Sequence, residues 1–224
     1  MDNLYTQILD GLERAGLILL ILSVIVWAVR YVVLPKSIKI LGIYLLLNLV
    51  VQIVADQLWQ RSMNNLYLLH LITLLDFVCL SFFFKEIYLN YEKFKEYFYY
   101  IIGTITTLLI LNSIFLEPLD FFNSNARILV QSILITYVIM YLFDAFGKVD
   151  FSKREEQVIS LICFAILIYY AGSLSTYLFS QFYSEEIKEG LRPIWVINGF
   201  LTALFQFILL MGIIRLGFRP KIQA

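Results

Sequence analysis

Seven apolar segments, each long enough to cross a lipid bilayer, follow one another along the 224-residue chain. A helix needs about 20 apolar residues to span the hydrocarbon core, and because lipid offers no hydrogen bonds the backbone must satisfy its own polar groups by forming a helix. We predict spans near residues 16–33, 38–59, 66–84, 97–115, 126–146, 158–179 and 194–216. The predicted fold is therefore all-α, a single seven-transmembrane-helix bundle that occupies residues 1–224.

The four prolines of the chain support this division into spans. A proline inside a helix removes a backbone hydrogen bond and kinks the chain, so prolines are expected at or outside the ends of the spans. This expectation applies to Pro35, Pro118, Pro193 and Pro220.

The composition is that of a protein built for lipid. Hydrophobic residues make up 61% of the chain and charged residues 15%, whereas soluble domains have roughly 45–50% and about 25%. The formal net charge is +0, which argues against a nucleic-acid partner, because nucleic-acid-binding proteins present a basic face. The expected partner is the lipid bilayer.

Lysines and arginines are unequally divided between the two sides of the predicted bundle. Twelve of the 17 lie at one set of span ends and five, including Arg127, lie at the other. Short loops rich in lysine and arginine stay in the cytoplasm. We therefore expect a multi-pass protein of the plasma membrane, the inner membrane of a bacterium, with its N-terminus outside and its C-terminus in the cytoplasm.

Polar residues within the spans concentrate in the outer half of this predicted bundle, while the inner half is mainly Leu, Ile, Phe, Val and Tyr. A pocket open to the outside has this distribution, whereas a pore needs a polar lining on both sides of the midplane. The alternative is that amides and hydroxyls only bond helices together, for about 0.6 kcal/mol per pair. The candidate pocket residues are Asp76, His70, Asn48, Gln52, Asn198, Gln206, Gln131, Asn112, Tyr169 and Ser173.

The third span carries the single histidine of the chain, His70, and a carboxylate near the membrane midplane, Asp76. An ionisable group at this depth is costly unless it faces protein or water, so each is a functional candidate. No lysine or arginine is expected at the depth of Asp76, and we therefore expect a neutral acid that can exchange a proton. Six positions separate the pair by about 120° around the helix, so they could line one cavity without bonding each other. Otherwise His70 bonds a neighbouring helix, and Asp76 bonds Asn48, Gln206 or a tyrosine hydroxyl.

The stretches LPKSIKILGIYLLLNLVVQ and NNLYLLHLITLLDFVCLSFFF, which cover the second and third spans, resemble a group of small bacterial seven-helix integral membrane proteins. In that group an Asn-Asn pair, a histidine and an acidic residue six positions further belong to the third helix. The corresponding residues here are Asn64, Asn65, His70 and Asp76. The resemblance implies a seven-helix membrane fold and no particular activity.

Several chemistries are excluded by what the spans lack. The seventh span contains no lysine, so a retinal Schiff base like that of rhodopsins cannot form there. A single histidine excludes a multi-histidine metal centre, and no protease motif with Gly-x-Gly-Asp or Gly-x-Ser-Gly occurs. We assign no catalytic residue, no metal ligand and no cofactor.

Three functions remain open. The first is a receptor-like or sensory module that takes a small polar or amphiphilic ligand from outside and acts through a cytoplasmic or membrane partner protein. The second is a proton-coupled transporter of small solutes, with Asp76 as the coupling carboxylate and His70 on the access path. The third is an intramembrane lipid hydrolase, similar to lysoplasmalogenase-type enzymes, in which these two residues serve as acid and base. A subunit whose polar residues only pack helices is a fourth alternative.

Overall fold

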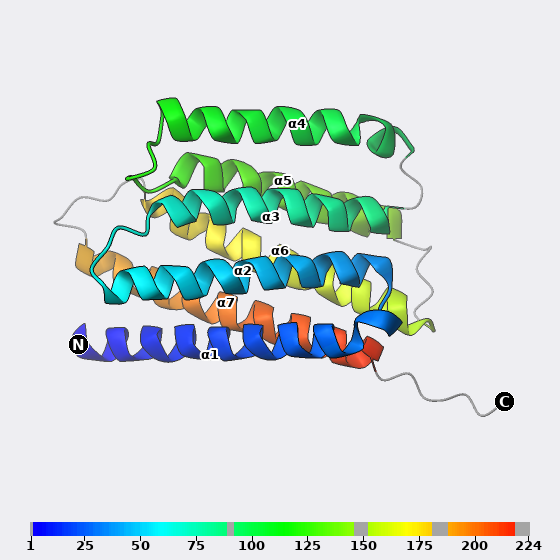
Figure 1. The fold of residues 1–224 in the computed structure, drawn as a ribbon, viewed down its shortest axis with the longest axis horizontal. Helices are drawn as coiled ribbons and strands as arrows, with labels where there is room; N and C mark the ends of the chain where they lie inside the picture. The colour runs from blue at the N-terminus through cyan, green and yellow to red at the C-terminus, as the bar shows by residue number, and fades with distance from the viewer. Residues whose placement is uncertain (1, 89–91, 146–151, 181–187, 218–224) are drawn as a thin grey trace.

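The computed structural model describes residues 2–88, 92–145, 152–180 and 188–217. The described chain forms seven long helices that run alternately back and forth, with one short 3₁₀ turn after the first (Figure 1). The elements are α1 (Asp2–Arg30), η1 (Tyr31–Val33), α2 (Lys36–Gln60), α3 (Tyr67–Ile87), α4 (Glu92–Phe115), α5 (Ser124–Ala145), α6 (Arg154–Ser180) and α7 (Lys188–Gly217).

All seven helices are long and apolar enough to cross a membrane. Every one of them also exposes large apolar side chains on the outside of the bundle, a surface that water would disfavour and lipid would not. The prediction of an all-α, seven-helix protein is confirmed, and these helices are those of a multi-pass membrane protein.

The helix ends differ from the predicted spans in two informative places. α1 begins at Asp2 rather than near residue 16, because the polar segment before the apolar run continues the helix. Pro193 lies inside α7, so the expectation for this proline is wrong. It stands in the second turn of the helix, where it removes a single backbone hydrogen bond close to a terminus whose first four N–H groups are unpaired in any case. The predicted end of the fifth span at residue 146, and Pro220, lie outside the described residues.

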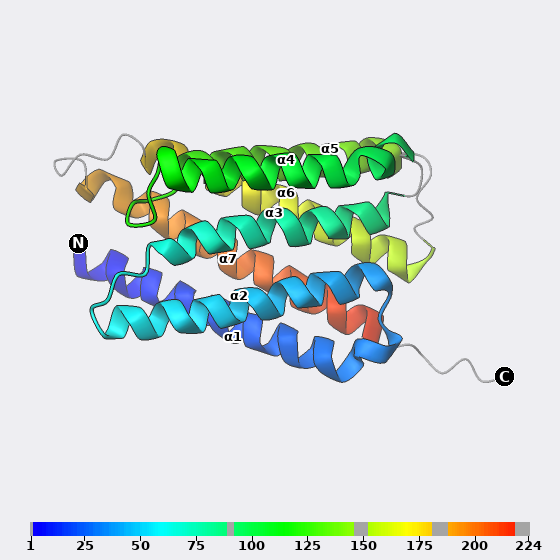
Figure 2. The same ribbon diagram turned by 45° about the horizontal axis from the view of Figure 1, so that its top comes forward.

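Six helices form a closed ring, and α4 lies outside it. Around the ring each helix packs against the next in the order α1, α2, α3, α5, α6, α7, and α7 packs against α1 again. α4 packs against α3 and has a smaller contact with α5, at the edge of the bundle in both views (Figures 1 and 2). The interior of the ring is therefore lined by six helices, and α4 does not contribute to it.

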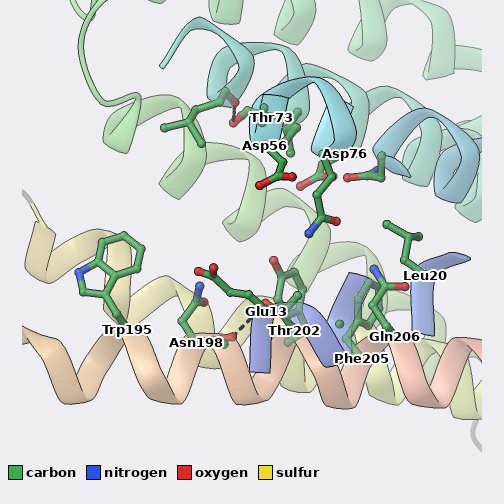
Figure 3. A pocket seen from close by; sticks show the side chains of 18 of the residues that line it. Glu13, Leu20, Asp56, Thr73, Asp76, Trp195, Asn198, Thr202, Phe205 and Gln206 are labelled. Carbon is green, nitrogen blue, oxygen red and sulfur yellow. Dashed lines mark hydrogen bonds between the residues drawn. The ribbon is translucent and has the colours of Figure 1, made fainter. Parts of the chain in front are cut away.

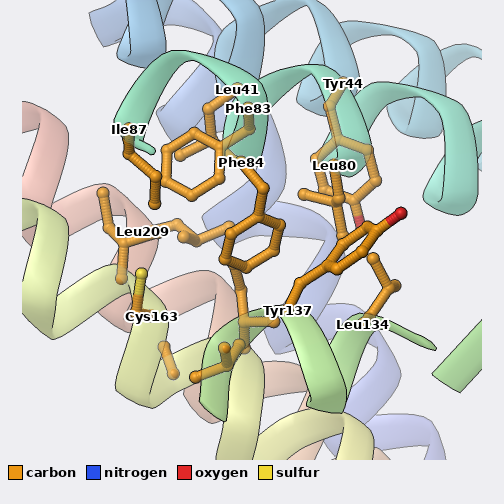
Figure 4. Packing of buried hydrophobic residues seen from close by; sticks show 14 of the residues in the cluster. Leu41, Tyr44, Leu80, Phe83, Phe84, Ile87, Leu134, Tyr137, Cys163 and Leu209 are labelled. Carbon is orange, nitrogen blue, oxygen red and sulfur yellow. The ribbon is translucent and has the colours of Figure 1, made fainter. Parts of the chain in front are cut away.

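The ring has two ends, which we name by the chain. At its amino-terminal end α1 begins, α2 ends and α3 begins, and at its carboxy-terminal end α7 ends (Figure 1). Buried aromatic and aliphatic side chains fill the carboxy-terminal half (Figure 4). The ring of Phe84 packs against that of Tyr137 with centroids 5.5 Å apart, and edge-on to that of Phe83 at 5.4 Å. In lipid such packing stabilises through van der Waals contact rather than through exclusion of water.

Candidate ligand-binding cavity

A cavity of about 670 Å³ lies inside the ring toward its amino-terminal end, and all six ring helices line it. Its volume is within the range of roughly 300–1,000 Å³ that is typical of small-molecule sites. Among the lining residues Asp10, Asp56 and Trp59 are exposed, so the cavity reaches the surface at the amino-terminal end. We call this opening the entrance and the opposite, buried part of the cavity its floor.

Six of the residues predicted for a pocket line this cavity, and they come from α2, α3, α6 and α7 (Figure 3 draws several of them). In Figure 3 the labelled side chains of α7 point across the space toward those of α2 and α3. The six residues are Asn48, Gln52, Asp76, Tyr169, Asn198 and Gln206.

At the floor, Asp76 forms a buried ion pair with Arg127. Nη1 of Arg127 donates a hydrogen bond to Oδ2 of Asp76 at 2.7 Å, and the two side chains are 8% and 2% exposed, respectively. The expectation that no cation lies at the depth of Asp76 is therefore wrong, and the argument for an isolated neutral acid fails with it. Arg127 stands in the first turn of α5, and its long side chain reaches across to the carboxylate of Asp76 on α3.

The guanidinium of Arg127 is also held by an aromatic ring. It lies over the ring of Tyr177, 5.3 Å from the centroid, in a cation–π contact. Tyr177 stacks on Phe122 with centroids 5.8 Å apart, and Trp195 packs edge-on to Phe122 at 6.1 Å. Desolvated cation–π contacts of this kind contribute about 2 kcal/mol. The guanidinium of Arg127 is therefore held by Asp76 of α3 and by Tyr177 of α6.

Several buried polar atoms of the cavity wall have no hydrogen-bond partner within the described part of the chain. They are Oε1 of Gln206, Oδ1 of Asn198 and Nε of Arg127. The carboxylate of Asp76 has the hydroxyls of Tyr44 and Tyr170 beside it, as the sequence offered for this residue. Leaving a buried polar group unpaired costs about 1–3 kcal/mol, and native proteins pair the large majority of them. A bound molecule that reaches the unpaired atoms would recover this free energy.

His70 lies outside the cavity lining and bonds neighbouring segments instead. Its Nδ1 is 2.8 Å from Oγ of Ser113 in α4, and its Nε2 is 3.2 Å from the backbone carbonyl of Phe121. Because a carbonyl oxygen only accepts, Nε2 carries the proton. His70 thus joins α3 to α4 and to the segment before α5, and the structure does not bring it together with Asp76 at one site.

The other three predicted residues also lie outside the cavity lining. Nδ2 of Asn112, on α4, donates to Oε2 of Glu117 at 2.8 Å. Nε2 of Gln131 donates to Oγ of Ser173 at 2.9 Å, and both side chains are buried between α5 and α6. The bond between Gln131 and Ser173 is an interhelical bond of the kind that the sequence offered as the alternative to a pocket, whereas that of Asn112 is local to the end of α4.

The sequence reasoning missed the contribution of α1 and the role of Arg127. Asp10 and Glu13 line the cavity near the entrance, from a segment that the prediction placed before the first span. One signal was available for the arginine: Arg127 falls inside the predicted fifth span, where a charged side chain has to find a partner or reach the interface.

Comparisons with protein-family models, with curated proteins and with solved structures find no match to this chain. The geometry of the cavity and its charges are therefore the guide to its function.

Proposed function

We propose that this protein is a receptor-like or sensory membrane module that binds a small polar ligand in its cavity from outside the cell. In this proposal the N-terminus lies outside and the C-terminus in the cytoplasm, as the distribution of lysine and arginine favours. Because Arg127 is buried in the cavity, it no longer counts among the charges flanking the outer ends. The remaining asymmetry of lysine and arginine is sharper, and it supports an entrance at the outer surface.

The observation that carries the proposal is a cavity lined by six helices, with charged and amide side chains on its wall, that ends at a buried ion pair. Moving two charges out of water costs several kcal/mol each, and their attraction offsets this cost only in part. Helices could be joined far more cheaply by amides or by apolar packing. A buried ion pair at the end of a cavity therefore supports a role in binding over a role in assembly alone.

The packed half of the ring supports a binding module over a transporter. A transporter must expose its site to both sides of the membrane in turn. Beyond the floor of the cavity, the described residues of the ring helices are packed aromatic and aliphatic side chains. The lipid-hydrolase alternative has less support, since His70 is engaged with Ser113 and Phe121 away from the cavity. Uptake of solute into proteoliposomes under a pH gradient would favour transport instead.

The test is to block the cavity without removing any polar group. Ala55 lines the cavity, and Ala55→Trp would fill space near the entrance. The matched control is Ala171→Trp, at an exposed position of α6 away from the cavity lining. Thermal unfolding of the three proteins in lipid nanodiscs is measured against a library of small polar metabolites.

We expect at least one compound to stabilise the unmodified chain and the control but not Ala55→Trp. At a concentration of about 100 times Kd a ligand stabilises by about 2.7 kcal/mol, which corresponds to a rise in Tm of roughly 5–10 °C for a chain of this size. The same compounds stabilising all three proteins equally would contradict a ligand site in the cavity.

A further inference from the structure

We infer that the ligand of this cavity is a protonated amine, a small organic cation with several N–H donors. This inference rests on the proposed function, because it names the chemical class of the molecule that the cavity takes. Three independent features of the cavity carry it: the charges at the entrance, the unpaired atoms on the wall, and the size of the space.

The charged residues that line the cavity are predominantly acidic. Asp76 and Arg127 neutralise each other at the floor, which leaves Asp10, Glu13 and Asp56 toward the entrance. None of these three carboxylates forms an ion pair with a lysine or arginine whose side chain the structure describes. A cleft lined by one sign of charge concentrates counter-ions and raises their association rate, so the entrance favours a cation.

The placement of these acids strengthens the effect. Asp10 and Glu13 are one turn apart on the same face of α1, and Asp56 stands at the end of α2 on the same side of the ring. Asp56 accepts a hydrogen bond from Nε2 of Gln60 at 2.8 Å, which leaves its charge uncompensated. Like charges gathered around one opening repel each other, and a bound cation relieves that repulsion.

The unpaired oxygen atoms deeper in the cavity call for a hydrogen-bond donor, whereas an unpaired nitrogen, Nε of Arg127, calls for an acceptor. Oε1 of Gln206 lines the cavity without a described hydrogen-bond partner, on a residue that is only 8% exposed. Oδ1 of Asn198 is in the same situation on the same face of α7. The carboxylate of Asp76, which is 1% exposed, has two tyrosine hydroxyls beside it in addition to Arg127. An amide oxygen can only accept, and an ammonium group offers three donors and no acceptor.

The size of the space and the aromatic wall favour an organic cation over a metal ion. No group of three or more histidine, cysteine, aspartate or glutamate side chains within the described ranges could hold a metal, and about 670 Å³ is far more than a bare ion fills. Tyr169, stacked on Phe205 with centroids 4.8 Å apart, lines the cavity together with Trp195. Aromatic faces of this kind attract cations.

The experiment uses four probes that each contain five carbons and differ in their two terminal groups. Cadaverine carries two ammonium groups, and 5-aminovalerate (ω-aminovalerate) carries one ammonium and one carboxylate. Glutarate carries two carboxylates, and pentane-1,5-diol carries no charge. Binding of each to the full chain in nanodiscs is measured by calorimetry and by tryptophan fluorescence, since Trp59 and Trp195 line the cavity. Concentrations extend to about 10 mM, to detect even a weak complex with Kd near 1 mM.

We expect cadaverine to bind most tightly, ω-aminovalerate more weakly, and the diol and glutarate not at all. The variant Asp10→Asn/Glu13→Gln/Asp56→Asn should weaken cadaverine binding at least tenfold. The matched control removes three exposed acids at the carboxy-terminal end, as Glu92→Gln/Glu96→Gln/Glu155→Gln, and should leave the affinity unchanged.

Two results would overturn the inference. Glutarate or the diol binding as tightly as cadaverine would remove the preference for a cation, and binding of none of the four would remove the amine itself. Either result leaves the proposed function standing if Ala55→Trp still abolishes stabilisation by another compound. Equal loss of cadaverine binding in both triple variants would show a general effect of charge, and it too would overturn the role of the entrance.

Discussion

The two halves of the ring share one exterior and differ in what they enclose. Both present apolar side chains outward, yet the amino-terminal half surrounds a cavity with charged and amide side chains on its wall. The carboxy-terminal half is filled by rings such as those of Phe84 and Tyr137. In a membrane, packing and hydrogen bonds between helices hold a bundle together, so the packed half can supply stability. The hollow half contains unpaired polar atoms that packing alone does not explain.

The largest effect that separates the halves is expected from breaking the ion pair at their boundary. Arg127→Leu leaves the carboxylate of Asp76 buried without a cation, and we expect a loss of about 3–5 kcal/mol in the free energy of unfolding. The double variant Asp76→Leu/Arg127→Leu removes both charges and should recover most of that loss. The measurement is chemical unfolding in detergent micelles. If the double variant is as unstable as the sum of its single changes, the pair is not coupled as described.

In the packed half, a single added methyl group should lower the free energy of unfolding. A Cβ placed on Gly42 of α2 would lie 1.9 Å from Nε1 of Trp27 in α1, so Gly42→Ala forces the two helices apart or moves the indole. We expect a loss of about 1–3 kcal/mol.

The control is Gly103→Ala on α4, where nothing lies within 4 Å of the added atom. This variant should be neutral or more stable by up to about 1 kcal/mol. Equal destabilisation of both variants, followed by thermal unfolding, would show that the close packing of α1 on α2 is not what the first substitution disturbs.

His70→Ala separates a structural role from a role in binding. The variant loses the contacts to Ser113 and Phe121, and we expect it to be less stable by about 1–2 kcal/mol. Cadaverine affinity should stay within twofold of that of the unmodified chain, because His70 does not line the cavity. A tenfold loss of affinity in a folded variant would place the histidine in the site after all.

The substitution Gln206→Leu is expected to have the smallest effect on stability. It should still weaken ligand binding. This change removes an acceptor that has no described partner, so the free energy of unfolding should change by less than about 1 kcal/mol. Affinity for cadaverine should nevertheless fall by roughly tenfold, since a hydrogen bond to a charged donor is worth about 1.5–3 kcal/mol. Unchanged affinity would remove Gln206 from the ligand contacts.

Most of the fold can be predicted from the sequence, but only part of the cavity can. Hydropathy alone places the seven spans, and the alternation of helix direction then places Asp76 and Gln206 at a common depth. Depth, however, says nothing about the order of helices around the bundle. Asn112 lies at a suitable depth but on α4, outside the ring. That order is set by tertiary packing, which periodicity does not encode.

The charges show the same limit. The position of Arg127 at the start of a span was read as a loop charge, because the reach and direction of a long side chain depend on its neighbours. Its partner Asp76 is 51 residues away in sequence, and nothing in the local pattern of either helix pairs them. Likewise Asp10 and Glu13 read as a polar terminus until α1 is extended and packed against α7.

Access to the two halves from outside the cell tests the central claim most directly. Thr202 lines the cavity and Leu209 is fully buried two turns further along α7. Intact cells that carry Thr202→Cys or Leu209→Cys are treated with a positively charged, membrane-impermeant thiosulfonate. Labelling of the unmodified chain measures the contribution of the two native cysteines, Cys79 and Cys163. We predict rapid labelling of Thr202→Cys, slowed by cadaverine, and no labelling of Leu209→Cys. Failure to label Thr202→Cys from outside, or equal labelling of both, would contradict an outward-facing cavity above a closed half.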